Sequence, residues 1–250
     1  MERLLGAHSN AVAAGRPPVS GRTPRVVVRP VKGGLELRVD GTLASFRSTS
    51  GAATGTVWWT LAAPVVLVAR ARPRVLLLGL GAGSVAAAVR ALAPAAEIVG
   101  VERSRDVLRA ARRHFDLDRH RVEIVADDAF DYLRRERRRF DLVVEDLFVG
   151  SVRRVRKPEG LLDEGYPLIG RRLADGGFAV SNTIHESPAV VRAMRRFGPR
   201  VVSMDVHGHW NRIVLGGCAV PDARALRRQL AAVAPLAPVL PRLSVRGWPG

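Results

Sequence analysis

The chain has 250 residues, with 40 Lys and Arg against 23 Asp and Glu, which gives a formal net charge of +17 at pH 7. Its composition, 47% hydrophobic and 25% charged, is that of a chain that buries a sizeable core, so disorder throughout is excluded. No apolar run approaches the ~18 residues of a membrane span, and no signal-peptide pattern opens the chain. We therefore expect a cytoplasmic protein without a membrane partner. The single Cys218 excludes an internal disulfide and a multi-thiolate zinc site.

The positive charge comes almost entirely from arginine, because Lys32 and Lys157 are the only lysines. Such a charge can indicate a nucleic-acid partner, since each neutralised phosphate releases counterions. Here the arginines are dispersed and aromatic residues make up 5% of the chain, whereas surfaces that stack bases interleave the two kinds. We attribute the charge to a compositional preference for arginine and expect no nucleic-acid partner.

The N-terminal part of the chain divides into an arm and a small β region. Residues 1–24 are rich in Gly, Ala, Ser, Arg and Pro without a period, which predicts a flexible arm. Within residues 25–56, two alternating apolar and polar segments flank Gly33 and Gly34, which predicts a β-hairpin. Residues 57–68 then read as a buried helix that opens the next domain.

From Arg74 onward, short apolar runs alternate with amphipathic segments, which indicates a parallel sheet covered by helices. The predicted strands are 74–79, 97–102, 122–126, 140–146 and 176–182, and the predicted helices lie near 83–93, 104–115, 128–138, 159–174 and 187–197.

Two more predicted strands, 201–206 and 213–218, are joined by too short a segment for a helical crossover, so they form an antiparallel hairpin. A parallel sheet that ends in such a hairpin predicts an α/β, Rossmann-like class I methyltransferase fold over residues 57–220, and not a nicotinamide-binding domain. Residues 221–250 predict a helix and a Pro-rich tail.

A glycine-rich loop follows the first strand of this domain. Gly79, Gly81 and Gly83 stand at a strand-to-helix junction, where the chain turns sharply and a ligand must approach the backbone closely. Ser84 stands where a dinucleotide site carries its third glycine. The spacing therefore favours S-adenosylmethionine (SAM) or its decarboxylated form over NAD.

Carboxylates end the next strands. Glu102 can accept hydrogen bonds from both hydroxyls of a ribose, and the alternative is a solvated acid at a strand end. Of Asp127 and Asp128, one can cap the following helix and the other can take an adenine amino group. Asp146 ends the fourth strand beside the first, at the switch point where open α/β sheets bind ligands.

These acids form a predicted cluster in an otherwise basic chain, which favours a cationic ligand. Its members are Glu102, Asp127, Asp128, Asp131, Glu145 and Asp146. For Asp131 and Glu145 we favour plain surface exposure over a role in binding.

The order of the motifs resembles the spermidine synthase (polyamine aminopropyltransferase) family over residues 25–217. The motifs that carry the resemblance are residues 37–41, 74–84, 101–102, 126–129, 140–146, 159–166 and 173–177. The resemblance implies an N-terminal β-domain, a Rossmann-like catalytic domain, a nucleoside site and, as is often the case in the family, a homodimer. We expect no metal. It assigns the nucleoside loop to Gly79, Gly81 and Gly83, the ribose ligand to Glu102, the adenine-side contacts to Asp128 and Ala129, and the deprotonation of the attacking amine to Asp146.

The sequence departs from the family where the family holds its amine. Val149 stands in place of a second aspartate that binds the polyamine, and Ala44 stands at about the place of a glutamine. The family's tyrosine-containing motif is not recognisable in residues 55–59. The nucleoside half of the site is thus intact and the acceptor half is altered, as in divergent bacterial spermidine-synthase-like proteins.

Three functions remain open from the sequence. The first is aminopropyl transfer from decarboxylated SAM to an amine, and the second is SAM-dependent methyl transfer to another small-molecule acceptor, which the missing second acid favours. A non-catalytic nucleoside sensor or nucleic-acid-binding protein ranks last, because the cofactor residues are intact. Further candidates for the acceptor pocket, each more often structural, are Tyr166, Asn182, His185, His207 and His209.

Overall fold

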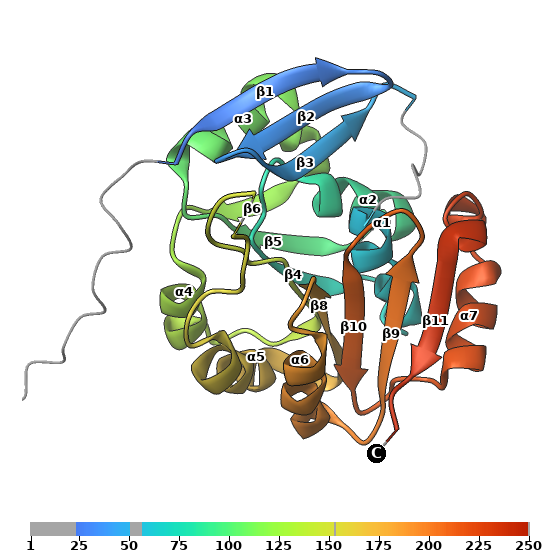
Figure 1. The fold of residues 1–250 in the computed structure, drawn as a ribbon. Coiled ribbons are helices and arrows are strands. Elements are labelled where there is room, and N and C mark those ends of the chain that lie inside the picture. Colours follow the sequence, from blue (N-terminus) through green and yellow to red (C-terminus); the bar gives the residue numbers. More distant parts are fainter. Residues whose placement is uncertain (1–23, 51–56, 153, 250) are drawn as a thin grey trace, which may run out of the picture.

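The computed structural model describes residues 24–50, 57–152 and 154–249, so the predicted arm lies outside the described residues except for residue 24. Within these ranges the chain forms a three-stranded antiparallel sheet and an eight-stranded mixed sheet (Figure 1). No helix in the described part is both long and apolar enough to cross a membrane.

The small N-terminal sheet consists of β1 (Val26–Val31), β2 (Gly34–Val39) and β3 (Thr42–Ser48), paired in that order. The predicted hairpin is confirmed as β1 and β2, but β3 was missed because its Ser and Thr content resembles a loop. The turn between β2 and β3 is Asp40-Gly41, and both residues have positive φ, 48° and 83°. Such an Asp-Gly pair is a strong hairpin signal, so β3 could have been predicted from the sequence.

The main sheet has the strand order β11-β9-β10-β8-β7-β4-β5-β6. Its strands are β4 (Arg74–Leu78), β5 (Glu97–Val101), β6 (Val122–Val125), β7 (Phe140–Glu145), β8 (Leu173–Thr183), β9 (Val201–Val206), β10 (Arg212–Gly217) and β11 (Leu243–Gly247). The strands from β4 to β8 pair in parallel, and β10 pairs antiparallel with both β8 and β9. The predicted class I methyltransferase layout is confirmed, with β11 added in the predicted tail.

The helices cover both faces of this sheet. They are α1 (Val57–Ala62), α2 (Ser84–Leu92), α3 (Arg105–His114), α4 (Ala129–Arg135), α5 (Tyr166–Arg172), α6 (Ser187–Met194) and α7 (Ala223–Ala231). Short 3₁₀ turns lie at Ala63–Leu67, Leu117–His120, Arg195–Phe197, Ala234–Leu236 and Leu240–Arg242, and a π-helical turn lies at Leu161–Gly165.

Two predicted helices differ most from the structure in their bounds. The helix expected at 57–68 ends at Ala62 and continues as a 3₁₀ turn, because Pro64 has no N–H to donate within an α-helix. The helix expected at 159–174 is a π-helical turn followed by α5. β8 correspondingly begins at Leu173, three residues before the predicted strand start at 176.

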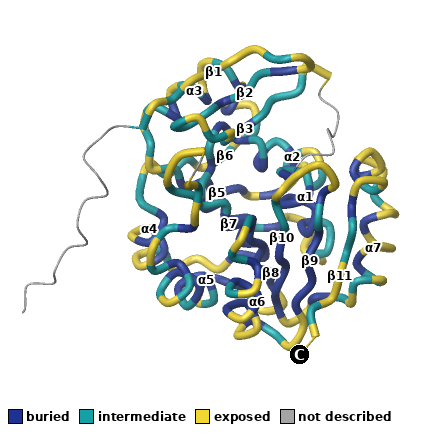
Figure 2. Tube along the Cα trace, viewed as in Figure 1, coloured by how far each residue is buried: buried dark blue, intermediate teal, exposed yellow. Residues whose placement is uncertain are grey.

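The core lies on both faces of the main sheet, as expected when helices cover a parallel sheet on each side. Alternate residues of β4 point to opposite faces, so Val75 and Leu77 pack with α1, α2, α3 and α7, while Leu76 and Leu78 pack with α4, α5 and α6. Figure 2 shows the central strands buried and the outer surfaces of the helices exposed. The small sheet lies over one end of this core, where β1 contacts α3 and β3 contacts α2.

Candidate functional site

The glycine loop lies between two other parts of the chain. Gly79, Gly81 and Gly83 all have positive φ, at 86°, 56° and 90°. A Cβ on Gly79 would lie 2.6 Å from the backbone oxygen of Asp146, and one on Gly81 would lie 2.8 Å from Oγ of Ser45. Glycine is therefore required at these positions by both conformation and space.

The N-terminal sheet holds this loop through two serines. Ser45 is 1% exposed, and its Oγ accepts a 2.8 Å hydrogen bond from the N–H of Ala82. In the opposite direction, Ser84 Oγ accepts the N–H of Phe46 at 2.9 Å and donates to the Phe46 carbonyl at 3.0 Å. The contact of Ser45 with the loop was not predicted, since its only signal in the sequence is its place beside Ala44. The small sheet therefore forms part of the site.

Glu102 is partly buried and bonded to the loop, so the alternative of a solvated strand-end acid is wrong. Its Oε2 accepts the N–H of Gly81 at 3.0 Å, and its Oε1 accepts the N–H of Ser104 at 2.9 Å. Burial raises the pKa of Glu102, and these two backbone hydrogen bonds oppose the rise. Each oxygen keeps a second lone pair, so the carboxylate fits the vicinal hydroxyls of a ribose.

The two aspartates after β6 have different partners. Asp128 caps α4, since its Oδ1 accepts the N–H of Phe130 at 2.8 Å. Asp127 accepts the N–H of Asp128 at 2.8 Å and forms an ion pair with Arg135. The buried Ala129 follows at the first turn of α4. No hydrogen bond to Asp128 Oδ2 occurs among the described residues, so Asp128 can cap α4 and still accept a hydrogen bond from an adenine amino group.

Asp146 comes directly after β7 and is anchored from two sides. Its N–H donates to the carbonyl of Leu78 at 2.9 Å, which fixes it beside the glycine loop. Its Oδ1 accepts a 2.8 Å hydrogen bond from Asn182, whose Oδ1 in turn accepts one from Asn211 at 2.9 Å. Burial raises the pKa of Asp146 to about 6, although the Asn182 bond and the charge of Lys157 oppose the rise. A carboxylate with this pKa can exchange a proton near neutral pH.

The neighbouring Glu145 is 1% exposed, so the expected surface exposure of this residue is wrong. β7 is covered on both faces, and its last side chain points inward to Nζ of Lys157, at 2.7 and 2.9 Å. The same carboxylate accepts Ser181 Oγ at 2.5 Å and the N–H of Leu147 at 2.8 Å. Burial, with the charge of Glu145, raises the pKa of the adjoining Tyr166.

Half of the predicted acidic cluster is neutralised by ion pairs. Its ion pairs are Asp127 with Arg135, Asp131 with Arg134, and Glu145 with Lys157. Asp131 is exposed, as expected. Glu102, Asp128 and Asp146 are the cluster members without an ion pair in the described part of the chain. The cluster therefore gives weaker support for a cationic ligand than its composition indicated.

The histidine candidates make no hydrogen bond to these acids in the described part of the chain. His185 is exposed, and Nε2 of His207 lies 2.9 Å from Ser244 Oγ in β11. Burial and the charge of Arg242 lower the pKa of His209. No group of three or more potential metal-ligating His, Cys, Asp or Glu side chains occurs among the described residues.

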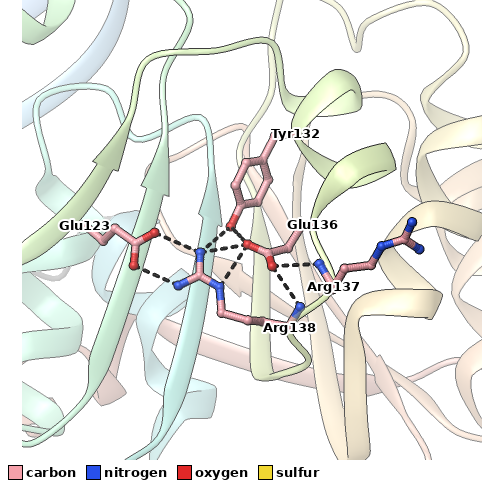
Figure 3. A network of polar contacts seen from close by, with 5 residues as sticks. All are labelled: Glu123, Tyr132, Glu136, Arg137 and Arg138. Carbon is pink, nitrogen blue, oxygen red and sulfur yellow. Dashed lines mark hydrogen bonds and ion pairs between the residues drawn. The ribbon is translucent and has the colours of Figure 1, made fainter.

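A second polar network anchors the C-terminal end of α4, whose N-terminal end carries Asp128 (Figure 3). The guanidinium of Arg138 donates to both oxygens of Glu123 at 2.8 Å and to Glu136 at 2.7 Å, and Tyr132 also donates to Glu136. Although burial opposes the shift, the hydrogen bonds from Arg138 and Tyr132 lower the pKa of Glu136 to about 2. This network ties α4 to β6 and so holds the strand-to-helix turn that carries Asp128.

Comparison with known proteins places this geometry in a fold group. A methyltransferase domain family matches residues 75–160. A protein described as a probable spermidine synthase from Corynebacterium glutamicum ATCC 13032 is similar in structure, with a TM-score of 0.72, 19% identity, and coverage of 91% of this chain and 89% of that one. No curated protein sequence matches the chain.

Two further structures are similar over less of the chain. The spermidine synthase from Thermotoga maritima has a TM-score of 0.59 at 19% identity, covering 77% of this chain and 68% of that one. Human methyltransferase-like protein 13, solved in complex with SAH, has a TM-score of 0.58 at 19% identity, covering 70% and 91%. The chain thus has a divergent, spermidine-synthase-like form of the class I methyltransferase fold.

Proposed function

We propose that this protein is a transferase that binds SAM or decarboxylated SAM and transfers an aminopropyl group to an amine acceptor. The observation that carries the proposal is the position of Asp146, which touches the glycine loop through its backbone and holds its carboxylate on Asn182. A proton-accepting group is thereby fixed beside the place where a nucleoside would lie.

The nucleoside side of the site supports a SAM-type ligand. The glycine loop exposes backbone at the end of β4, while Glu102 offers acceptors for a ribose and Asp128 offers one for adenine. The similar structures carry the same kind of ligand in two cases, the human protein with SAH and a spermidine synthase with the transition-state analogue AdoDATO. We assign Gly79, Gly81, Gly83, Glu102, Asp127, Asp128 and Ala129 to this half of the site.

The reaction needs a neutral amine, because an ammonium has no lone pair. The carboxylate of Asp146 accepts a proton from the acceptor's ammonium, and the freed lone pair forms a bond to the methylene carbon next to sulfur. The carbon–sulfur bond breaks with its electron pair going to sulfur, and methylthioadenosine leaves. The positive charge moves from sulfur to nitrogen, so the chemistry depends on alignment and on one proton transfer.

Methyl transfer from SAM is the second candidate. The observation in its favour is the neutral Glu145–Lys157 pair next to Asp146, because an acceptor half without spare carboxylates has little attraction for a polycation. The donor loop would serve both reactions, with S-adenosylhomocysteine as the product of methyl transfer.

Two measurements test the proposal. Isothermal calorimetry with SAM, decarboxylated SAM and methylthioadenosine should give binding of at least one, and the Glu102→Gln variant should weaken it. The matched control is Asp131→Asn, which changes an exposed acid outside the site. Mass spectrometry of amines incubated with each donor then distinguishes an added aminopropyl group from an added methyl group. No binding of any nucleoside would overturn both candidate reactions.

A further inference from the structure

We infer that a cavity at the edge of the main sheet where its parallel strands begin binds a small molecule that carries a pyrophosphate or similar multiply charged phosphate group. This basic cavity has a volume of about 580 Å³, which is within the range of small-molecule sites. It is separate from the site of the proposed function, because the glycine loop and Asp146 lie at the opposite edge, where the same strands end.

The beginnings of four neighbouring strands contribute to the wall of the basic cavity. Arg74 and Phe140 are the first residues of β4 and β7, while Glu97 is the first residue of β5 and Arg121 directly precedes β6. β4 has five residues, at about 3.3 Å per residue, so about 16 Å separates the cavity from the glycine loop at the other end of this strand.

The lining of the basic cavity carries more positive than negative charge. It contains five arginines and two glutamates, which are Arg72, Arg74, Arg90, Arg121, Arg138, Glu97 and Glu123. Both glutamates have an arginine partner of their own. Glu97 lies 3.1 Å from Arg72, and Glu123 lies 2.8 Å from Arg138 (Figure 3). The charges of the other three arginines are therefore not balanced by these two carboxylates.

Arg90 and Arg121 place two like charges side by side. Nη1 of Arg90 and Nη2 of Arg121 both donate to the carbonyl of Pro94, at 2.6 and 3.2 Å. Arg90 also donates to the carbonyls of Ala96 and His120, which fixes its guanidinium at the cavity wall. Neither arginine forms an ion pair with a carboxylate in the part of the chain that the structure describes. A bound anion would offset the repulsion between them.

Arg121 and Arg74 have donors left for such an anion. Arg121 is exposed, and apart from its bond to Pro94 its guanidinium donates to no acceptor within the described ranges. Nε of Arg74 is buried and has no hydrogen-bond partner among the described residues. Its ion-pair partner Asp141, at 3.9 Å, is shared with Arg70 at 3.3 Å. The planar fork of an arginine matches the oxygens of a phosphate group.

The remaining lining suits an organic body beside the phosphate. Val99 and Phe140 are 4% and 2% exposed, and they give the cavity an apolar side. A monocarboxylate would leave most of the positive charge unbalanced, whereas a phosphate ester carries about −1.5 to −2 and a pyrophosphate group carries more. Inorganic pyrophosphate and an organic diphosphate share this chemistry, so the experiment uses one of each.

Isothermal calorimetry with inorganic pyrophosphate and with thymidine diphosphate tests the site. Thymidine diphosphate has an organic body but lacks the vicinal ribose hydroxyls that Glu102 fits. In about 50 mM NaCl at least one probe should bind with a Kd below about 1 mM, and its affinity should fall in about 300 mM NaCl, because salt screens the arginines. Tighter binding of thymidine diphosphate would indicate an organic ligand, and tighter binding of pyrophosphate an inorganic one. No binding of either probe would overturn the inference.

Arg121→Gln should weaken binding of the probe at least about fivefold, because it removes a charged donor. Arg74→Gln should have the same effect and provides the measurement if the first variant does not fold. The matched control is Arg192→Gln, which removes one charge from an exposed position on α6. Losses no larger than in this control would show that the overall charge of the protein holds the anion, which would overturn the inference.

Glu102→Gln separates the basic cavity from the nucleoside site. It should leave the affinity for pyrophosphate within about twofold while it weakens nucleoside binding, and Arg121→Gln should do the reverse. A large loss of pyrophosphate binding in Glu102→Gln would place the anion at the glycine loop and overturn the inference. Failure of every SAM-type nucleoside to bind the wild-type protein would refute the proposed function alone.

Discussion

The two halves of the site use carboxylates in opposite ways. In the nucleoside half, Glu102 and Asp128 are bonded to backbone N–H groups and keep acceptor capacity for a ligand. In the acceptor half, Glu145 forms an ion pair with Lys157, whereas Asp146 has no ion pair in the described structure. The same edge of one sheet thus presents free acceptors on one side and an internally neutralised surface on the other. Under the proposed function, donor binding and acceptor choice would therefore depend on different side chains.

Replacement of the proposed base should give the largest contrast between the halves. Asp146→Asn should lower kcat by about 10²- to 10⁴-fold, because the amide cannot accept the proton. Nucleoside affinity should stay within about threefold, since the Asn182 contact and the backbone of the loop remain. Steady-state kinetics and calorimetry on the same sample provide the measurement. A variant with wild-type kcat would show that Asp146 is not the base.

Gly79→Ala should give the second-largest effect, on the glycine loop and on nucleoside binding. The new Cβ would lie 2.6 Å from the Asp146 carbonyl at a φ of 86°, so the loop must shift. We expect about 2–4 kcal/mol lower unfolding free energy in urea, together with weaker nucleoside binding. Gly176→Ala is the matched control, because its φ is 74° and nothing lies within 4 Å. Equal losses of unfolding free energy in the two variants would show that the close contact between Gly79 and the Asp146 carbonyl does not matter.

Ser45→Ala should have a smaller effect that tests the link from β3 to the loop. It leaves the N–H of Ala82 without its partner, which costs about 1–3 kcal/mol. We expect the loss to appear in nucleoside affinity as well as in unfolding free energy. Ser48→Ala, at a partly exposed position on the same strand, should change neither by more than about 0.5 kcal/mol. Unchanged nucleoside affinity in Ser45→Ala would show that the small sheet does not contribute to nucleoside binding.

The pH dependence of the reaction should show the smallest effect. Asp146 has a raised pKa of about 6 and must be ionised to act, so kcat/KM should fall as the pH drops through 6 and level off above it. The Asn182 hydrogen bond favours the ionised form, so Asn182→Leu should move the acid limb of the profile to higher pH. A profile that is flat between pH 5 and 7 would contradict this assignment of the base.

The parallel strands and the glycine turn after β4 could be predicted because their signals are local. A buried strand, a glycine turn and a strand-end acid follow each other within a few residues, as with Gly79 after β4 and Glu102 after β5. The antiparallel pairing of β9 and β10 followed from a local feature too, since their short connection leaves no room for a helical crossover.

The acceptor half depends on contacts between distant residues, which no local pattern encodes. Glu145 meets Lys157 and Ser181 from two different segments, and the burial of β7 on both faces turns an expected surface acid inward. Ser45 likewise reaches Ala82 across 37 positions of sequence. Short-range periodicity cannot reveal such pairs, because the tertiary fold alone brings them together.

The added strand β11 limits how two copies of this chain can associate. It pairs with β9 along Leu243–Gly247 and so covers the backbone N–H and C=O groups that the hairpin would otherwise present. At the opposite end of the main sheet, β6 has four residues, a short template for pairing with another strand. A homodimer, which many members of the resembled family form, would therefore not continue the main sheet through β9, because β11 is the edge strand at that end of the sheet.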